Sequence, residues 1–246
     1  MNETEATVGR PDGKTIKRFY REASVGEEGG LWRVLLDDKA MRTPAKAMLA
    51  VQSRPLAEAI AAEWAGQGEL IAPAIMYLTR FANTAIDRVQ GAEAAVLDDV
   101  VAYAGSDLLL YRAEASGGLR ARQDAAWNPP LEWAREALHA HFRIAEGIRA
   151  IEQPAESIER LHAFFAPFDA FALTALHVMT TITGSALLTA AHAGGAMDLD
   201  AIWAAAHVDE DWQIGKWGED DEAVARRARR CREMQAAAHL LRLTAP

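Results

Sequence analysis

The sequence has little of what several large classes of protein depend on. Cys231 is the single cysteine among 246 residues, which excludes an intramolecular disulfide and is typical of a reducing compartment. The 26 basic residues are outnumbered by 35 acidic ones, so the net charge is −9. Because general binders of nucleic acid or of anionic membranes depend on Lys and Arg, this balance argues against both classes. We therefore expect no nucleic-acid partner.

Common catalytic motifs are also missing. The chain contains no glycine-rich phosphate loop followed by Lys and Ser or Thr, no dinucleotide fingerprint, no zincin helix and no nucleophile elbow. The histidines do not form a ligand pattern, since His139 and His141 are two residues apart and would point to different sides of a helix. We expect histidines that pack in the core or cap helices, and we predict no cofactor.

One long stretch, residues 170–197, contains no Asp, Glu, Lys or Arg. It is long enough to cross a bilayer. Threonine, serine and histidine interrupt it, however, and no basic residues flank it, so we predict a buried central helix of a helical bundle and no stable membrane insertion. Residues 1–16 lack the apolar core of a signal peptide and are predicted to form a flexible tail on a cytoplasmic protein.

The first third of the chain has the two-residue periodicity of β-strands. In LWRVLLDD, Trp32, Val34 and Leu36 alternate with Arg33 and Leu35. The preceding GEEGG is typical of a hairpin connection, and a proline soon after the strand breaks any helix. We predict a small antiparallel β-rich domain over residues 17–52.

From residue 53 onward, helical patterns dominate. Ser53 is placed to cap a helix that ends at Gly66. At Asn128-Pro129-Pro130 we expect one helix to end and another to begin, and we expect the last helix to begin near Asp220. The sequence thus predicts an α+β fold, in which a larger, mainly α-helical domain over residues 53–246 follows the β-rich domain.

The most unusual segment is VDEDWQIGKWGEDDEA, residues 208–223, where seven carboxylates surround Trp212 and Trp217. Asp220 or Asp221 is placed to cap the last helix. The two indoles are five residues apart, which is poor register for one buried helix face, so at least one is expected on the surface of a loop. Tryptophan is enriched in interface hot spots. The residues alone leave open whether the indoles fill a core or form an edge that a partner contacts.

The same carboxylates suggest an alternative function. A calcium loop of the EF-hand type that begins at Asp209 would need glycine at its sixth position, where this chain has Ile214. A metal-assisted hydrolase that uses residues 209–222 stays as the alternative hypothesis. We assign no residue as a metal ligand and none as catalytic.

Five stretches resemble one known family: KRFYREASV, LTRFANTAIDRV, YAGSDLLLYRAE, QDAAWNPPLEWA and VDEDWQIGKWGEDDEA. They are similar to the assembly chaperones of the catalytic head of ATP synthase, which occur in mitochondria and alphaproteobacteria, and the similarity spans about Lys17 to Leu243. The resemblance implies a protein without catalytic turnover that binds the α subunit and shields its interface until the hexamer forms. It also implies a small β-containing domain before a larger helical one, in the bacterial cytoplasm or, for eukaryotic members, the mitochondrial matrix.

The resemblance also implies two sets of functional residues. The acidic Trp-Gly motif of the family is expected to bind the partner, and it corresponds to Asp209, Glu210, Trp212, Gln213, Trp217, Gly218, Glu219 and Asp220. The central motif corresponds to Leu78, Thr79, Arg80, Asn83, Thr84 and Asp87. For Arg80, Asn83 and Asp87, an internal hydrogen-bond network is favoured over contact with the partner, and Trp64 is likewise expected in the core; both roles remain open for these four residues.

Overall fold

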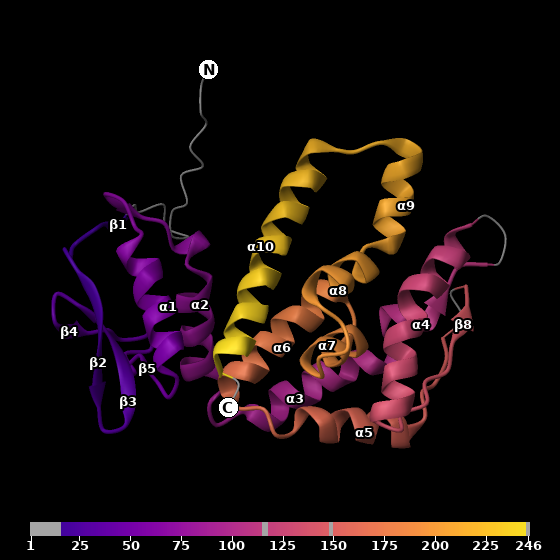
Figure 1. Ribbon diagram of the computed structural model, residues 1–246, viewed down its shortest axis with the longest axis horizontal. Helices are drawn as coiled ribbons and strands as arrows, with labels where there is room; N and C mark the ends of the chain where they lie inside the picture. Colours follow the sequence, from indigo (N-terminus) through magenta and orange to yellow (C-terminus); the bar gives the residue numbers. More distant parts are fainter. Residues whose placement is uncertain (1–15, 115–117, 148–149, 245–246) are drawn as a thin grey trace. The chain divides into compact units, whose positions relative to one another are not determined.

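The computed structural model describes residues 16–114, 118–147 and 150–244 (Figure 1). The tail predicted over residues 1–16 lies outside this description except for its last residue. The chain divides into two compact units, one of Met1–Gly91 with Arg242–Pro246 and one of Ala92–Leu241. The domain boundary expected after residue 52 stays a prediction.

The first unit is built on an antiparallel sheet around a central strand. Its strands are β2 (Ala23–Glu28), β3 (Leu31–Leu36), β4 (Lys39–Ala40) and β5 (Ala50–Val51), and the other three all pair with β3. Gly29 and Gly30 join β2 to β3, and both have positive φ angles, 64° and 78°, as a tight two-residue hairpin turn requires. Val34 and Leu36 are buried, so the alternation predicted from the sequence is confirmed.

Helices cover this sheet and complete the first unit. Helix α1 (Arg54–Ala65) packs on β2 and β3. It begins where predicted, because the Oγ atom of Ser53 accepts a hydrogen bond from the backbone N–H of Leu56 at 3.2 Å. The remaining elements are β1 (Ile16–Lys17) paired with β6 (Leu70–Ile71), a 3₁₀ turn (Pro73–Ile75), α2 (Tyr77–Thr84) and a π-helical turn (Ala85–Val89).

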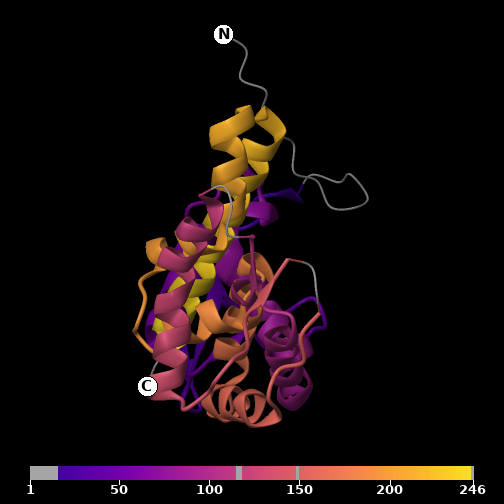
Figure 2. The same ribbon diagram turned by 90° about the vertical axis from the view of Figure 1, so that its right-hand side faces the viewer.

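The second unit is a bundle of helices: α3 (Glu93–Ala102), α4 (Leu119–Ala137), α5 (Ala155–Phe165), α6 (Ala170–Thr183), α7 (Ala186–Ala193), α8 (Leu199–Ala206), α9 (Val208–Trp217) and most of α10 (Asp221–Thr244). Two 3₁₀ turns (Tyr103–Gly105 and Leu108–Leu110) and a parallel pair of short strands, β7 (Tyr111–Arg112) and β8 (Ala145–Glu146), complete it. The helices α9 and α10 form two arms joined by a turn that projects beyond the rest of this unit (Figures 1 and 2).

The uncharged stretch forms the centre of this bundle, as two helices rather than the single one expected. Gly184, with φ of 68°, ends α6, and the Oγ atom of Ser185 caps α7 by accepting from the N–H of Leu188 at 2.9 Å. Most residues of α6 and α7 are buried. Over the part of the chain that the structure describes, none of the helices combines the length and the apolar character that a membrane crossing needs.

The helix break predicted at Asn128-Pro129-Pro130 is wrong, since α4 continues through both prolines. Prolines in a helix interior remove backbone hydrogen bonds and normally bend or break the helix. Here tertiary contacts hold the segment. Trp127 is fully buried and donates from Nε1 to the carbonyl of Ala205 at 2.7 Å, and Asn128 accepts from the guanidinium of Arg112 at 3.1 Å.

Candidate partner-binding site

The acidic segment forms helix α9 and the first turn of α10, so the expectation that an indole lies on a loop is wrong. Both Trp212 and Trp217 belong to α9. Residues five apart on a helix are separated by about 140° around its axis, and the two indoles therefore face different surroundings. The surface location was right for one of them: Trp217 is 78% exposed.

Trp212 faces the second unit rather than solvent. The guanidinium of Arg122 on α4 lies 4.9 Å from the centre of its ring, and the ammonium of Lys216 lies 4.5 Å from it. Gly118, at the start of α4, leaves so little space that a Cβ atom there would be 3.2 Å from the indole. Trp212 therefore holds α9 against α4.

Asp209 also faces α4. Its Oδ1 atom accepts a hydrogen bond from the side-chain amide of Gln123 at 2.7 Å. Gln123 is buried, and its Oε1 atom accepts a hydrogen bond from the backbone N–H of Ala113 at 2.7 Å. Asp209 thus joins Trp212 in fixing the helix and is turned away from the exposed face of α9.

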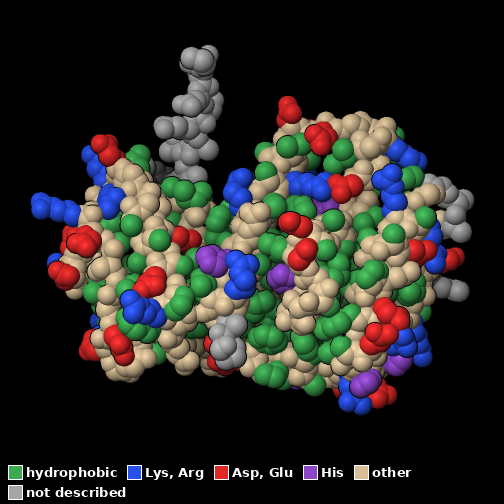
Figure 3. All heavy atoms as spheres, viewed as in Figure 1, with side chains coloured by type: hydrophobic (Ala, Val, Ile, Leu, Met, Phe, Trp, Pro, Cys, Tyr) green, Lys and Arg blue, Asp and Glu red, His purple; other side chains and the backbone are tan. Residues whose placement is uncertain are grey.

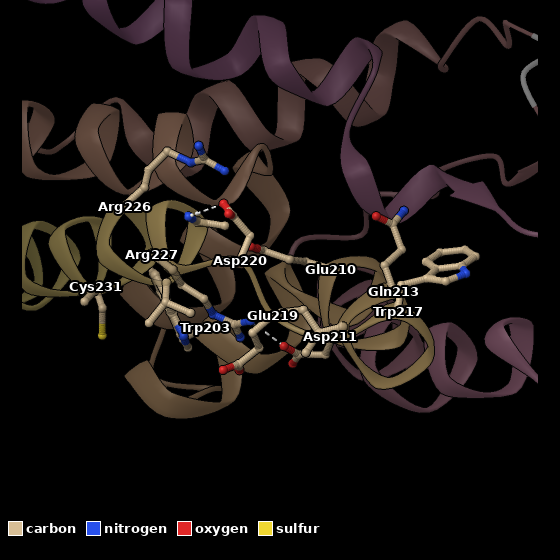
Figure 4. A pocket seen from close by; sticks show the side chains of 15 residues that line it. Trp203, Glu210, Asp211, Gln213, Trp217, Glu219, Asp220, Arg226, Arg227 and Cys231 are labelled. Carbon is tan, nitrogen blue, oxygen red and sulfur yellow. Dashed lines mark hydrogen bonds and ion pairs between the residues drawn. The ribbon is translucent and has the colours of Figure 1, made fainter.

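The exposed face of α9 forms one wall of a groove, and α10 forms the other. The groove encloses about 830 Å³. Figure 4 shows Gln213 and Trp217 on one side and Arg226, Arg227 and Cys231 on the other. The residues that line it are Trp203, Glu210, Asp211, Gln213, Ile214, Trp217, Gly218, Glu219, Asp220, Ala223, Val224, Arg226, Arg227, Ala228 and Cys231.

The groove carries charges of both signs. Arg227 on α10 forms an ion pair with Asp211 on α9, and this pair links the two walls of the groove. The ion pair also raises the pKa of the Arg227 guanidinium above its usual value. In Figure 3, acidic and basic side chains are mixed over the region of α9 and α10. The surface around this segment is therefore less uniformly acidic than its sequence suggests. Glu210 and Glu219 also line the groove, and their charges add to the rise in the pKa of Arg227.

Glu210 lies beside a histidine that does not donate a hydrogen bond to it. The Nε2 atom of His207 is 3.8 Å from Oε2 of Glu210. Burial lowers the pKa of His207, so its imidazole is neutral at neutral pH. Its Nδ1 atom lies 2.7 Å from the carbonyl of Trp203, which can only accept, so the proton is assigned to Nδ1 and Nε2 cannot donate to Glu210. Glu210 therefore receives no hydrogen bond from His207.

The turn between the helices is set by two residues. Gly218 ends α9 with φ of 86°, in the region where a side chain would be strained. Asp220 caps α10, because its Oδ2 atom accepts from the N–H of Ala223 at 2.9 Å. The capping role predicted for Asp220 is thus confirmed.

Among the described residues, no three His, Cys, Asp or Glu side chains are grouped so that they could hold a metal ion. Asp209 and Asp211 point to different neighbours, Gln123 and Arg227. The described part of the chain therefore gives no support to the alternative of a metal-assisted hydrolase.

Comparison with known proteins identifies the family. Residues 17–135 match the family described as ATP12 chaperone protein. Over 94% of its length, the chain is 42% identical to the Atu1473 protein of Agrobacterium tumefaciens, covering 87% of that protein with a TM-score of 0.91. It is 38% identical to Atp12 from Paracoccus denitrificans, covering 93% of this chain and 98% of that one with a TM-score of 0.88. The chain belongs to the ATP12 chaperone family.

Membership of the ATP12 family confirms the resemblance found in the sequence and makes the protein an assembly chaperone of ATP synthase. The family and the related structures indicate a chaperone rather than an enzyme. The small antiparallel sheet followed by a mainly helical part confirms the predicted α+β fold.

The central motif of this ATP12-family chain lies in the first unit, where several of its residues make internal hydrogen bonds. Asp87 accepts hydrogen bonds from the hydroxyl of Thr43 at 2.5 Å and from the N–H of Ala45 at 3.0 Å, and so anchors the turn before β5. The backbone N–H groups of Leu78 and Thr79 donate to the carboxylate of Glu63 at 2.7 and 2.8 Å, which caps the start of α2.

Trp64 and Asn83 fit this network less well. Both are half-buried, and among the described residues neither the Nε1 atom of Trp64 nor the Oδ1 atom of Asn83 has a hydrogen-bond partner. Arg80 donates to the carbonyl of Ala74 at 3.2 Å and lies over the ring of Tyr77, 5.3 Å from its centre. A purely structural role therefore accounts for Asp87 better than for Trp64 and Asn83.

Reasoning from the sequence missed the α10 wall of the groove. Apart from Asp220, which is among the residues expected to bind the partner, it is formed by Ala223, Val224, Arg226, Arg227, Ala228 and Cys231. These residues recur three and four positions apart, so they share one face of a helix, and this spacing is the signal that could have found them. The arginines among these positions obscure the pattern in the sequence.

Proposed function

We propose that this ATP12-family protein binds the newly made α subunit of ATP synthase and covers its subunit interface until the catalytic hexamer assembles. The observation that carries the proposal is the exposure of Trp217, 78%, at the mouth of a groove whose rim holds Glu210 and Glu219. A large exposed indole beside carboxylates is the composition of a docking edge rather than of a passive surface. The proposal places the protein in the bacterial cytoplasm.

An isolated α subunit is a suitable client for such a docking edge. Subunits of obligate oligomers bury large, apolar interfaces, and these interfaces aggregate when they are left uncovered. A chaperone must also release its client, so its contacts need to be strong enough to capture and polar enough to exchange. An indole anchor supplies the first requirement, and rim carboxylates that meet Lys or Arg on the client supply the second.

The residues of the acidic motif take different parts in this proposal. Glu210, Gln213, Trp217, Gly218 and Glu219 line the groove and are proposed to contact the client. Asp209 and Trp212 face α4, so they are proposed to position α9. Asp220 also lines the groove, but it caps α10, and its substitution would change the helix as well as the surface.

The test is capture of the isolated α subunit. Light scattering follows the aggregation of the α subunit with and without the chaperone, in the absence of ATP. The double variant Trp217→Ala with Glu219→Lys is expected to lose most of the protection, because it removes the anchor and inverts a rim charge. Glu159→Lys is the control, since Glu159 is exposed on α5, at the opposite end of the second unit from the α9–α10 turn (Figure 1).

The outcomes separate the function from the site. Protection by the wild-type protein and by the control, but not by the double variant, supports both. Equal protection by all three proteins contradicts the proposed edge while leaving the client in place. If the wild-type protein gives no protection to the α subunit, the proposed client is wrong.

A further inference from the structure

A second groove lies entirely within the first unit, far along the chain from the acidic motif. It encloses about 710 Å³. Its floor is the buried cluster of Tyr20, Leu36, Ile71 and Met76, and its sides include Phe19, Met41, Pro44, Trp64 and Pro73. Phe19 is 68% exposed. The groove is thus an open apolar surface with a large aromatic side chain at its edge.

Two polar atoms at this groove lack partners. Trp64 and Asn83 both line it, and within the described ranges the indole Nε1 and the amide Oδ1 make no hydrogen bond although both atoms are buried. A buried donor or acceptor without a partner destabilises a folded protein, and native structures contain few of them. The Trp64 Nε1–H group can only donate a hydrogen bond, and the Asn83 Oδ1 atom can only accept one.

The indole of Trp64 is held in place by its neighbours. The hydroxyl of Tyr20 donates to the Trp64 carbonyl at 2.7 Å, and the two rings meet edge to face with centres 5.6 Å apart. The unpartnered N–H therefore has a fixed orientation before anything binds, which lowers the entropy lost when a ligand accepts from it.

We propose that this groove binds an extended apolar segment of the client polypeptide, through side chains on the apolar floor and through its backbone at Trp64 and Asn83. A backbone carbonyl of the segment accepts from Trp64 Nε1, and a backbone N–H donates to Asn83 Oδ1. An extended peptide is the ligand that carries both groups together with apolar side chains. The inference rests on the proposed function, because the client is the same α subunit.

The charges around the groove specify the segment further. Among the described residues, the cations of Lys39 and Arg42 line it beside one carboxylate, that of Asp37. Asp37 already accepts from the backbone N–H groups of Arg21 and Glu22, at 2.9 and 3.0 Å. The rim is therefore positive in a chain whose net charge is −9, and the segment that fits it has an acidic residue beside its apolar stretch.

The chain's own N-terminal residues do not have this composition. Residues 1–15 read MNETEATVGRPDGKT, in which Met1 and Val8 are the only large apolar side chains and none is aromatic. They offer no apolar stretch to cover the floor of the groove. The occupant is therefore assigned to another polypeptide, and deletion of residues 1–15 is an arm of the test.

Site-specific cross-linking tests the occupant directly. A photoreactive phenylalanine analogue replaces Phe19 in the full chain, and in a control protein it replaces Leu31, which is 37% exposed at the β2–β3 turn and does not line the groove. After irradiation with the isolated α subunit, mass spectrometry is expected to find one apolar, acid-flanked segment cross-linked from position 19 and none from position 31. The same segment is expected when residues 1–15 are deleted.

Two substitutions test the hydrogen bonds. Trp64→Phe and Asn83→Leu each remove one unpartnered polar group while keeping most of the volume. Each is expected to weaken α-subunit binding roughly three- to tenfold, the effect of one net hydrogen bond, with a thermal midpoint equal to or close to that of the wild-type protein. Trp32→Phe is the control, because Trp32 is a half-buried tryptophan of the same unit that does not line the groove and is expected to have no effect on binding.

Each outcome decides one question. If the wild-type protein captures the α subunit but position 19 gives no client cross-link and the two variants bind normally, the groove inference is overturned and the proposed function stands. Cross-links from position 19 only to residues 1–15 overturn it as well. If the wild-type protein does not capture the α subunit, the inference is rejected together with the proposed function.

Discussion

Arg122 on α4 covers the indole of Trp212 on α9, with 4.9 Å between the guanidinium carbon and the centre of the ring. Trp217, five residues further along the same helix, is 78% exposed. The two tryptophans of one motif therefore have different physical roles: the first attaches the helix to the unit, and the second is presented to solvent.

This difference predicts that two alanine substitutions will lower the stability by unequal amounts. Trp212→Ala removes a half-buried indole and both of its cation contacts, so we expect it to lower the free energy of unfolding by about 2–3 kcal/mol. Trp217→Ala is expected to change it by less than about 0.5 kcal/mol, because little of that side chain is buried. Urea unfolding followed by circular dichroism measures both, and equal losses would contradict the assignment.

Gly118 gives an independent test of the same contact. Gly118→Ala introduces strain at a φ of 81° and places a Cβ atom 3.2 Å from the Trp212 ring. Gly91→Ala is the matched control, because Gly91 has a φ of 83° and no atom within 4 Å of the added Cβ. Both are expected to destabilise the protein by about 1 kcal/mol through the backbone, and Gly118→Ala by about 1 kcal/mol more. Equal losses in thermal unfolding would show that the indole does not pack closely on Gly118.

Asp87 is expected to stabilise the first unit. Asp87→Ala leaves the Thr43 hydroxyl and the Ala45 N–H without their acceptor, so we expect a loss of about 1–3 kcal/mol. Glu58→Ala is the control, since it removes only an exposed pair with Arg54 and is expected to cost below about 0.5 kcal/mol. Urea unfolding compares them. If Asp87→Ala unfolds like the wild-type protein, the network reading of this residue is wrong.

Asp107 gives a prediction about pH. Its carboxylate is fully buried and accepts from the N–H groups of Leu109 and Leu187, both at 3.1 Å. Burial raises the pKa of this carboxyl to about 6, from 3.8, against the opposing effect of its hydrogen bonds. A carbon-13 NMR titration is expected to place its midpoint near pH 6. A midpoint at or below 4 would show that the hydrogen bonds outweigh burial.

The sign of the effect on stability follows from proton binding. Between about pH 4 and pH 6, the folded state holds this proton while the unfolded state has lost it. The contribution of Asp107 to stability is therefore present below about pH 4 and falls as the pH rises to 6, by on the order of 3 kcal/mol. The difference in unfolding free energy between the wild-type protein and Asp107→Asn, measured across this range, isolates the effect from the other carboxylates.

Features of the fold that depend on short stretches of sequence could be predicted. The alternation of Val34 and Leu36, the paired glycines of the β2–β3 turn and the capping side chains of Ser53 and Asp220 each act on neighbouring residues. Their physical causes lie within a few positions of one another. A single sequence contains that information.

Features that depend on distant residues could not be predicted in the same way. The helix α4 continues through Pro129 and Pro130 because Trp127 is bonded to Ala205, 78 residues away. For the candidate site, the composition of residues 208–223 indicated an exposed tryptophan, but not which one. That choice depends on Arg122 and Gly118, which the sequence places about ninety residues before the motif.

The most direct test of the account is the affinity of the chaperone for the isolated α subunit, measured by calorimetric titration for the wild-type protein, Trp217→Ala and the control Glu159→Lys. Trp217 is proposed as the central anchor, so its removal is expected to weaken binding at least tenfold, the range of an interface hot spot, while the control binds like the wild type. An affinity of Trp217→Ala equal to that of the wild-type protein, with its helices intact, would contradict the account.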